Sequence, residues 1–211
     1  MGGWGPFARA FKPSRGLRVP PYLALLGLTD DAPTAIDIVA RLAGKRGAPE
    51  SFGALLTDPN WRPHLIAAVA ACVHRYPGDS AMLWNTADRG SWVVPQLVAA
   101  ISMIDESFRE SAIERLQDGC PMRTDEIDQL DDRLLLHSPR GPGGAKHRSA
   151  KMASALLGLL RDADPNDPAL EAFDRDVALQ ELIAVDIDRG GDIATAWRTE
   201  FRALLRQRAR P

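Results

Sequence analysis

The chain has 211 residues, 45% of them hydrophobic and 26% charged, which is ordinary for a folded protein with one sizeable core or a short helical solenoid. Its formal net charge of -2 excludes the global basic field that gathers nucleic acid or coats an anionic membrane. No apolar run approaches the roughly 18 residues of a membrane span and no leader pattern is present, so we expect a cytoplasmic protein.

The N-terminal residues 1–21 are predicted to form an irregular, partly mobile arm. They hold three glycines in the first five positions and four prolines, and they carry no acidic side chain. Residues 22–211 are predicted to form a single α-helical repeat domain. Its first clear helix begins at Pro33 and ends at Gly44.

A passage near the middle of the chain occurs twice. Each copy follows a short polar loop, at residues 57–60 and 88–91, and each has a tryptophan and a proline before an alanine-rich helix. A period of about 32 residues with one apolar helix in each unit is typical of stacked helical repeats. The aligned positions are Pro63 with Pro95, Leu65 with Leu97, Ala67 with Ala99 and Ala68 with Ala100.

The two copies differ in how their helices start. Asn60 is predicted to cap the first helix, which places Pro63 in the first turn, where a missing N–H costs little. If Ser91 capped the second, Pro95 would fall at the fourth helical position and displace a backbone hydrogen bond. The second helix therefore begins nearer Trp92 or is kinked.

The remainder of the chain also favours helices. An acidic helix is expected at residues 124–136, a Gly/Pro-rich loop at 138–144, a strong helix from about 147 to 160, and a basic amphipathic helix at the C-terminal end that caps the core. No stretch alternates long enough to predict a strand. The sequence thus predicts an all-α fold of stacked antiparallel helix pairs, with 58–76 and 90–104 as equivalent helices.

The first copy resembles the start of a HEAT/armadillo-type repeat. The resemblance rests on Leu55 to Arg62, followed by Leu65 and Ala68, and covers residues 28–117 at most. The second copy departs from the pattern, with Val93 and Val94 where a basic residue is usual. The resemblance implies a short solenoid with a binding surface along one face, and it carries over no catalytic residue. Such folds mainly serve as scaffolds, although a few bacterial members are DNA glycosylases or cofactor-handling enzymes.

These features favour a non-enzymatic protein-interaction module, such as an immunity protein or an adaptor. Arginine far outnumbers lysine in an alanine-rich chain, a composition typical of GC-rich bacterial genomes. The alternative is a HEAT-like DNA-binding repair enzyme of glycosylase type. Nucleic acid is the less favoured partner because of the net charge. Another protein, with an acidic surface, is the favoured partner because the expected contact residues include Arg62, His64, Arg89 and Gln96, beside the repeat helices.

A second candidate patch is the basic loop with Arg140, Lys146 and Arg148, which runs into a helix and can hold an anion or an acidic partner. It is not a P-loop, because its glycine spacing is wrong and no Ser or Thr follows the lysine. The alternative is that it lies against the acidic run at residues 125–132.

Three other patterns have a structural and a functional interpretation. Trp61, Trp84 and Trp92 could form an aromatic site, but we expect them to wedge adjacent repeats together, with Trp61 and Trp92 largely buried. Residues 186–197 match a calcium loop poorly, and a glycine C-cap followed by an Asp192 N-cap explains them. The histidines and the two cysteines show no metal spacing, so no metal or cofactor is expected.

Overall fold

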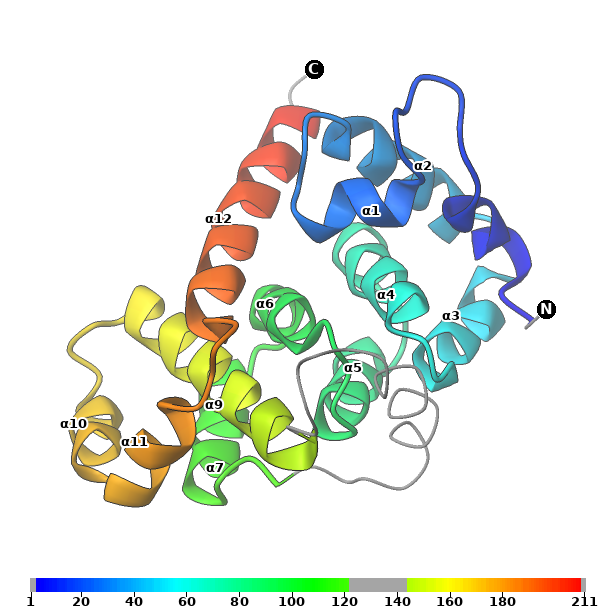
Figure 1. The fold of residues 1–211 in the computed structure, drawn as a ribbon. Coiled ribbons are helices and arrows are strands. Elements are labelled where there is room, and N and C mark those ends of the chain that lie inside the picture. The colour runs from blue at the N-terminus through cyan, green and yellow to red at the C-terminus, as the bar shows by residue number, and fades with distance from the viewer. Residues whose placement is uncertain (1–2, 122–143, 210–211) are drawn as a thin grey trace.

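A computed structural model describes residues 3–121 and 144–209, and every regular element within these ranges is a helix (Figure 1). This confirms the all-α prediction. The predicted acidic helix at 124–136 and Arg140 lie outside the described residues. The elements are η1 (Gly5–Phe11), α1 (Pro21–Leu26), α2 (Ala32–Ala43), α3 (Ala48–Thr57), α4 (Trp61–Val73), α5 (Asp79–Asp88), α6 (Val94–Ile104), α7 (Phe108–Gln117), α9 (Gly144–Ala163), α10 (Pro168–Arg175), α11 (Val177–Ile183) and α12 (Gly190–Arg208). None of the helices in the described part of the chain has both the length and the apolar character needed to cross a membrane.

The N-terminal segment, predicted to be irregular, contains the 3-10 helix η1. Phe7 and Ala10 are fully buried, and η1 contacts α1, α2 and α3. Residues three apart lie on one side of a 3-10 helix, so these two side chains face the core together. The Trp4 indole N–H adds a hydrogen bond of 3.1 Å to the Asp58 carboxylate.

The starts of α4 and α6 resolve the question about the two prolines. The Asn60 side chain accepts a hydrogen bond of 3.0 Å from the Arg62 backbone N–H, which confirms the predicted cap. Helix α6 begins at Val94, so Pro95 stands in its first turn and displaces no hydrogen bond. The Ser91 side chain does not cap this helix.

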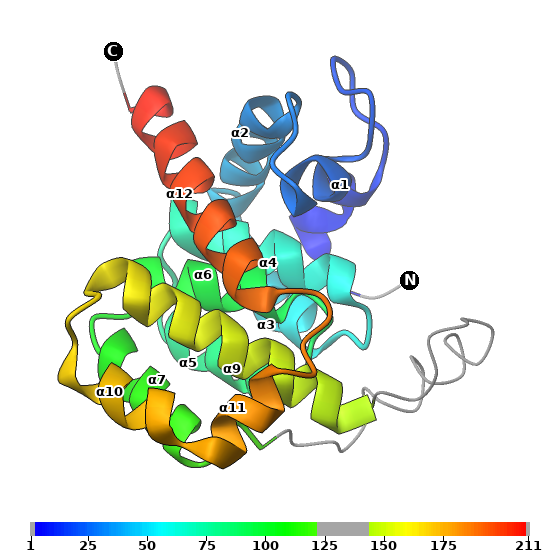
Figure 2. The same cartoon turned by 60° about the vertical axis from the view of Figure 1, so that its left-hand side comes forward.

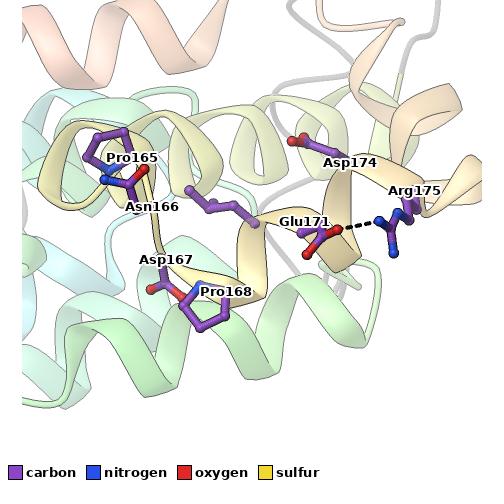
Figure 3. A pocket seen from close by; sticks show the side chains of 8 residues that line it. Pro165, Asn166, Asp167, Pro168, Glu171, Asp174 and Arg175 are labelled. Atoms are coloured by element: carbon purple, nitrogen blue, oxygen red, sulfur yellow. Dashed lines mark hydrogen bonds and ion pairs between the residues drawn. The ribbon is translucent and has the colours of Figure 1, made fainter.

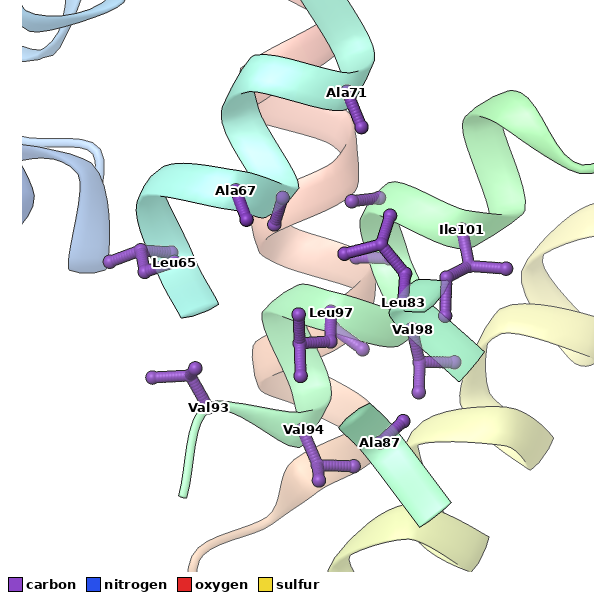
Figure 4. Close-up of a cluster of buried hydrophobic side chains, with 14 of the residues drawn as sticks. Leu65, Ala67, Ala71, Leu83, Ala87, Val93, Val94, Leu97, Val98 and Ile101 are labelled. Atoms are coloured by element: carbon purple, nitrogen blue, oxygen red, sulfur yellow. The ribbon is translucent and has the colours of Figure 1, made fainter. Parts of the chain in front are cut away.

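Helix α6 lies at the centre of the molecule and contacts α4, α5, α9 and α12 (Figure 1). Because neighbours surround it, it is apolar all round, and Gln96 is the one polar residue between positions 94 and 101. Leu65 and Leu97 are fully buried, as predicted. Figure 4 shows the core where the three central helices meet, with labelled side chains from α4 (Leu65, Ala67, Ala71), α5 (Leu83, Ala87) and α6 with the residue before it (Val93, Val94, Leu97, Val98, Ile101).

Helix α12, at the C-terminal end, also contacts the N-terminal part of the chain. It packs against α9 and α6, and its far end lies beside α2 (Figure 2). The Trp197 indole N–H donates to the Leu25 carbonyl at 2.9 Å, and Arg208 pairs with Asp37 at 2.8 Å. Repeats in an open solenoid contact only their neighbours, whereas these helices close around α6. The basic face of α12 is also less solvated than predicted, because Arg198 is buried and paired with Asp162.

The first two residues of α12, Gly190 and Gly191, allow close packing against α9. A Cβ atom on Gly190 would lie 2.5 Å from the Lys151 carbonyl oxygen, and one on Gly191 would lie 2.8 Å from that of Ser154. The helix begins at Gly190, so the predicted Asp192 cap is wrong. Close approach to α9 is the physical reason for glycine at both positions.

Candidate functional site

Three aromatic rings and two cations from four parts of the chain meet at one surface, which we call the aromatic–cation face. It comprises Tyr22 of α1, Trp61 and Arg62 of α4, Trp92 before α6, and Lys151 of α9. The Tyr22 and Trp61 ring centroids are 6.1 Å apart, and those of Trp61 and Trp92 are 5.0 Å apart. The Arg62 guanidinium lies 5.0 Å from the Trp61 centroid, and the Lys151 ammonium lies 5.0 Å from that of Trp92. Both cations therefore lie within cation–π range of an indole.

Trp92 is the most exposed large ring of this face. It is 48% exposed, while Val93 and Val94, which follow it, are fully buried. The prediction that Trp92 is largely buried is wrong, because α6 begins at Val94 and the two valines take the core positions. Trp61, the first residue of α4, is half-buried. The Trp92 ring is thus half-exposed, and the two residues that follow it are anchored in the core.

The five tryptophans differ in how their indole N–H groups are used. Trp4 donates to Asp58, Trp84 to Asp105 at 2.7 Å, and Trp197 to the Leu25 carbonyl. Among the described residues the Trp61 and Trp92 indole N–H groups, unlike the other three, donate to no acceptor. These two donors of the aromatic–cation face are therefore not used by the fold.

His64 ties together the loops that precede α4 and α6. One ring nitrogen, Nε2, donates to the Asp58 carbonyl at 2.7 Å, which fixes the tautomer, so Nδ1 accepts from the Ser91 hydroxyl at 2.8 Å. Burial lowers the pKa of His64 to about 4, so the ring is neutral at pH 7. These bonds hold the loops that precede the two repeat helices side by side.

Lys151 connects the face to α9 and to the loop before α12. Its side chain is almost fully buried, and its ammonium lies 2.8 Å from the Asp188 carboxylate and 3.4 Å from the Trp92 carbonyl. The hydrogen bond from Lys151 lowers the pKa of Asp188, so that carboxyl group is charged at neutral pH. This paired cation fixes the position of Trp92 relative to the rest of the fold.

Only one of the four predicted partner contacts lies on the aromatic–cation face. Arg62 is there, but His64 is fully buried and Gln96 is 6% exposed, with its amide donating to the Leu26 carbonyl. Arg89 donates to the Leu56 carbonyl at 2.6 Å. Polar side chains beside the repeat helices join neighbouring segments here, which leaves His64 and Gln96 inaccessible to a partner.

The two predicted patches are neighbours. Lys146 is exposed near the start of α9, and the Arg148 guanidinium donates to the Gly90 carbonyl at 3.1 Å, two positions before Trp92. The basic start of α9 therefore borders the loop that carries Trp92.

The same geometry offers little to a catalytic mechanism. Ser91 and His64 form a hydroxyl–imidazole pair, but they are 2% and 0% exposed, so a substrate cannot reach the hydroxyl. Burial raises the pKa of both Cys72 and Cys120 to about 12, which keeps the two thiols protonated and unreactive. Across residues 3–121 and 144–209 no three or more His, Cys, Asp or Glu side chains gather as a metal site would require.

Two surface depressions lie outside the aromatic–cation face. The larger, of about 300 Å³, is at the start of α10, where Glu171 pairs with Arg175 (Figure 3). Its Asp167 is held by Arg109 of α7 at 2.6 Å. The smaller, of about 150 Å³, includes Asp88, which Arg115 holds through two hydrogen bonds. These three carboxylates already have cationic partners, whereas Glu114 and Asp118 of the smaller depression are exposed acids.

Comparison of the chain with protein-family models, with curated proteins and with solved structures gives no match. The HEAT/armadillo resemblance accordingly stays an expectation.

Two members of the face, Tyr22 and Lys151, were not predicted from the sequence. Lys151 could have been noticed because it follows His147 by four positions and so lies on the same side of a helix, within a stretch that lacks acidic residues. Tyr22 follows two prolines and has no comparable pattern.

Proposed function

We propose that this protein is a non-enzymatic protein-interaction module with central units of HEAT type, and that it binds its partner through the aromatic–cation face. The observation that carries the proposal is Trp92, half-exposed above two fully buried valines, with an indole N–H that has no acceptor among the described residues. Tryptophan, tyrosine and arginine are the residues enriched at the energetic centres of protein interfaces. A ring already fixed in place loses little conformational entropy on binding.

An immunity protein or an adaptor fits this description, because either role requires recognition without catalysis. Supporting this choice, the one hydroxyl–imidazole pair described above is sealed inside the protein and joins two loops.

A second candidate function is a HEAT-like DNA-binding repair enzyme. The observation that favours it is the half-exposed Trp92 ring, because bases of nucleic acids stack on exposed aromatic side chains. Such binding would weaken steeply as salt rises, since it depends on phosphate contacts. Salt-dependent affinity for duplex DNA, measured by fluorescence, would support this candidate, and absence of affinity at low salt would remove it.

The interaction proposal is tested by capture from an extract of the organism that produces the chain. Immobilised wild-type protein, Trp92→Ala and a control, Val177→Ala, are compared by quantitative mass spectrometry. Val177 is 70% exposed on α11, so it matches Trp92 as an exposed apolar residue of a different element. We expect a protein retained by wild type and control and lost from Trp92→Ala. Equal retention by all three would refute a partner site at this face.

A further inference from the structure

We propose that the occupant of the aromatic–cation face is an extended acidic peptide segment of the partner, with carboxylates at alternate positions. This inference rests on the proposed function and adds the chemistry of the partner. The segment would accept hydrogen bonds from the Trp61 and Trp92 indoles and pair with Arg62.

The indole and guanidinium groups of the face are hydrogen-bond donors. An indole nitrogen and a guanidinium carry N–H groups and no acceptor, so they are satisfied by carboxylate or carbonyl oxygens. Arg62 uses its side chain for one hydrogen bond, of 3.3 Å to the Asn60 side chain, which leaves further donors in its fork. A ligand rich in acceptors therefore complements this surface.

The charge around the face also favours an acidic ligand. The aromatic row continues from Tyr22 to Phe11, with centroids 6.0 Å apart, and from Phe11 to Trp4 at 4.4 Å. The segment that supplies these two further rings has no acidic residue up to position 21, and its basic side chains are exposed. These cations are Arg9, Lys12, Arg15 and Arg18.

Three described carboxylates lie in this region. Asp188 is paired with Lys151, whereas Asp58 accepts from two neutral donors, the Trp4 indole and the Asn60 backbone. The third, Asp31, accepts from the Arg18 backbone N–H at 2.8 Å. Exposed Lys146 lies on the α9 side. Although the whole chain has a net charge of -2, this region is basic, and charge complementarity favours an acidic segment.

The contacts of the aromatic rings favour a peptide over a single-stranded nucleic acid. A nucleobase needs an open ring face on which to stack. Here the Arg62 guanidinium lies over both Tyr22 and Trp61, and Lys151 lies over Trp92. The Trp61 and Trp92 rings are also tilted by 45° against each other. Each indole thus has a cation and a tilted ring beside it, which suits hydrogen bonding by a peptide at the indole N–H better than flat stacking of a base.

Ring spacing indicates the conformation of the segment. Successive centroids from Tyr22 through Trp61 to Trp92 are 6.1 and 5.0 Å apart. In an extended peptide, side chains on one side recur every second residue, or about 6.6 Å. Acidic residues at alternate positions would therefore follow the row.

The test uses fluorescence anisotropy with the full chain and a fluorescein-labelled peptide in which glutamate alternates with serine. Its neutral counterpart has glutamine in place of glutamate, and a third probe is a single-stranded oligothymidylate of equal charge. We expect the glutamate peptide to bind at least about tenfold more tightly than the glutamine peptide at low salt, because charge-assisted hydrogen bonds are roughly twice as strong as neutral ones.

Three variants locate the binding. Trp92→Phe keeps a ring and removes the N–H, and it should weaken glutamate-peptide binding by about fivefold. Arg62→Gln should weaken it by roughly fivefold to tenfold. Arg175→Gln, on α10, should leave it unchanged, since its side chain is 76% exposed and belongs to a different element. Circular dichroism confirms that each variant is folded.

Equal affinity for the two peptides, no measurable binding of the glutamate peptide, or the same loss in Arg175→Gln as in Arg62→Gln would overturn the inference. Tighter binding of oligothymidylate with the same dependence on Trp92 would assign the face to nucleic acid. If a captured partner depends on Trp92 but contacts it through a neutral segment, as mapped by cross-linking, the inference fails and the proposed function stands. If capture does not depend on Trp92, the proposed function at this face fails.

Discussion

The two copies of the repeated passage reach the same buried core from different starts. In the first, Asn60 caps α4 and Trp61 is its first helical residue. In the second, no side chain caps α6, and Trp92 stands two residues before the helix. Leu65 and Leu97 nevertheless occupy equivalent buried positions. The tryptophan lies two positions before the proline in the first copy and three in the second. This offset, with the different helix start, leaves Trp92 more exposed than Trp61.

The two copies also differ in the polar residue that follows the proline. His64 follows Pro63 and Gln96 follows Pro95, and each side chain bonds to a backbone carbonyl of another segment. Only the histidine can titrate. The first copy is therefore sensitive to pH at a position where the second is not.

The largest expected effect tests the equivalence of the cores. Leu65→Ala and Leu97→Ala should each reduce the free energy of unfolding by about 2–5 kcal/mol, because each leaves a cavity in a fully packed site. Urea unfolding followed by circular dichroism measures both values, with Leu23→Ala, at a residue 38% exposed, as the control. A cost below that of the control at either leucine would break the equivalence.

The next effect concerns His64. Its pKa is about 4 in the folded state against 6.5 in a model peptide, so the unfolded chain binds a proton between these values while the folded chain does not. This contribution to stability is complete above pH 6.5 and is lost as the pH falls towards 4, by roughly 3 kcal/mol in total at about 1.4 kcal/mol per pH unit. Urea unfolding at several pH values measures the slope.

His64→Gln gives the first copy the residue of the second and supplies the matched comparison. Its unfolding free energy should depend less on pH in this window than that of the wild type. An unchanged slope would mean that other groups dominate the acid dependence.

A smaller effect tests the difference between the helix starts. Asn60→Ala should cost about 1 kcal/mol, since it removes the hydrogen bond to the Arg62 backbone N–H. Val93→Ala would not be a fair counterpart, because Val93 is fully buried. The better control is Ser107→Ala, since Ser107 precedes α7 and makes no side-chain cap bond. Thermal unfolding should separate the two variants, and equal melting temperatures would contradict the assigned cap.

The smallest expected effect distinguishes the tryptophans. Trp92→Phe should change the free energy of unfolding by less than about 0.5 kcal/mol, since its indole N–H has no acceptor in the described structure. Trp84→Phe should cost about 1 kcal/mol or more, because it leaves Asp105 without its 2.7 Å hydrogen bond. Chemical unfolding followed by circular dichroism measures both. A loss of stability in Trp92→Phe as large as in Trp84→Phe would show that Trp92 is structural.

Local pattern was enough to predict the helical class, the Asn60 cap and the burial of Leu65 and Leu97. Each depends on residues within one or two helical turns, where spacing and propensity decide the outcome. The tertiary structure alone decided which polar residues are accessible. His64 meets Ser91 across 27 positions, Lys151 reaches the Trp92 carbonyl across 59, and Gln96 reaches the Leu26 carbonyl across 70. Such contacts follow from how helices pack around α6, and no period in the sequence encodes them, so the exposure of Trp92 and the burial of His64 could not be predicted from the chain alone.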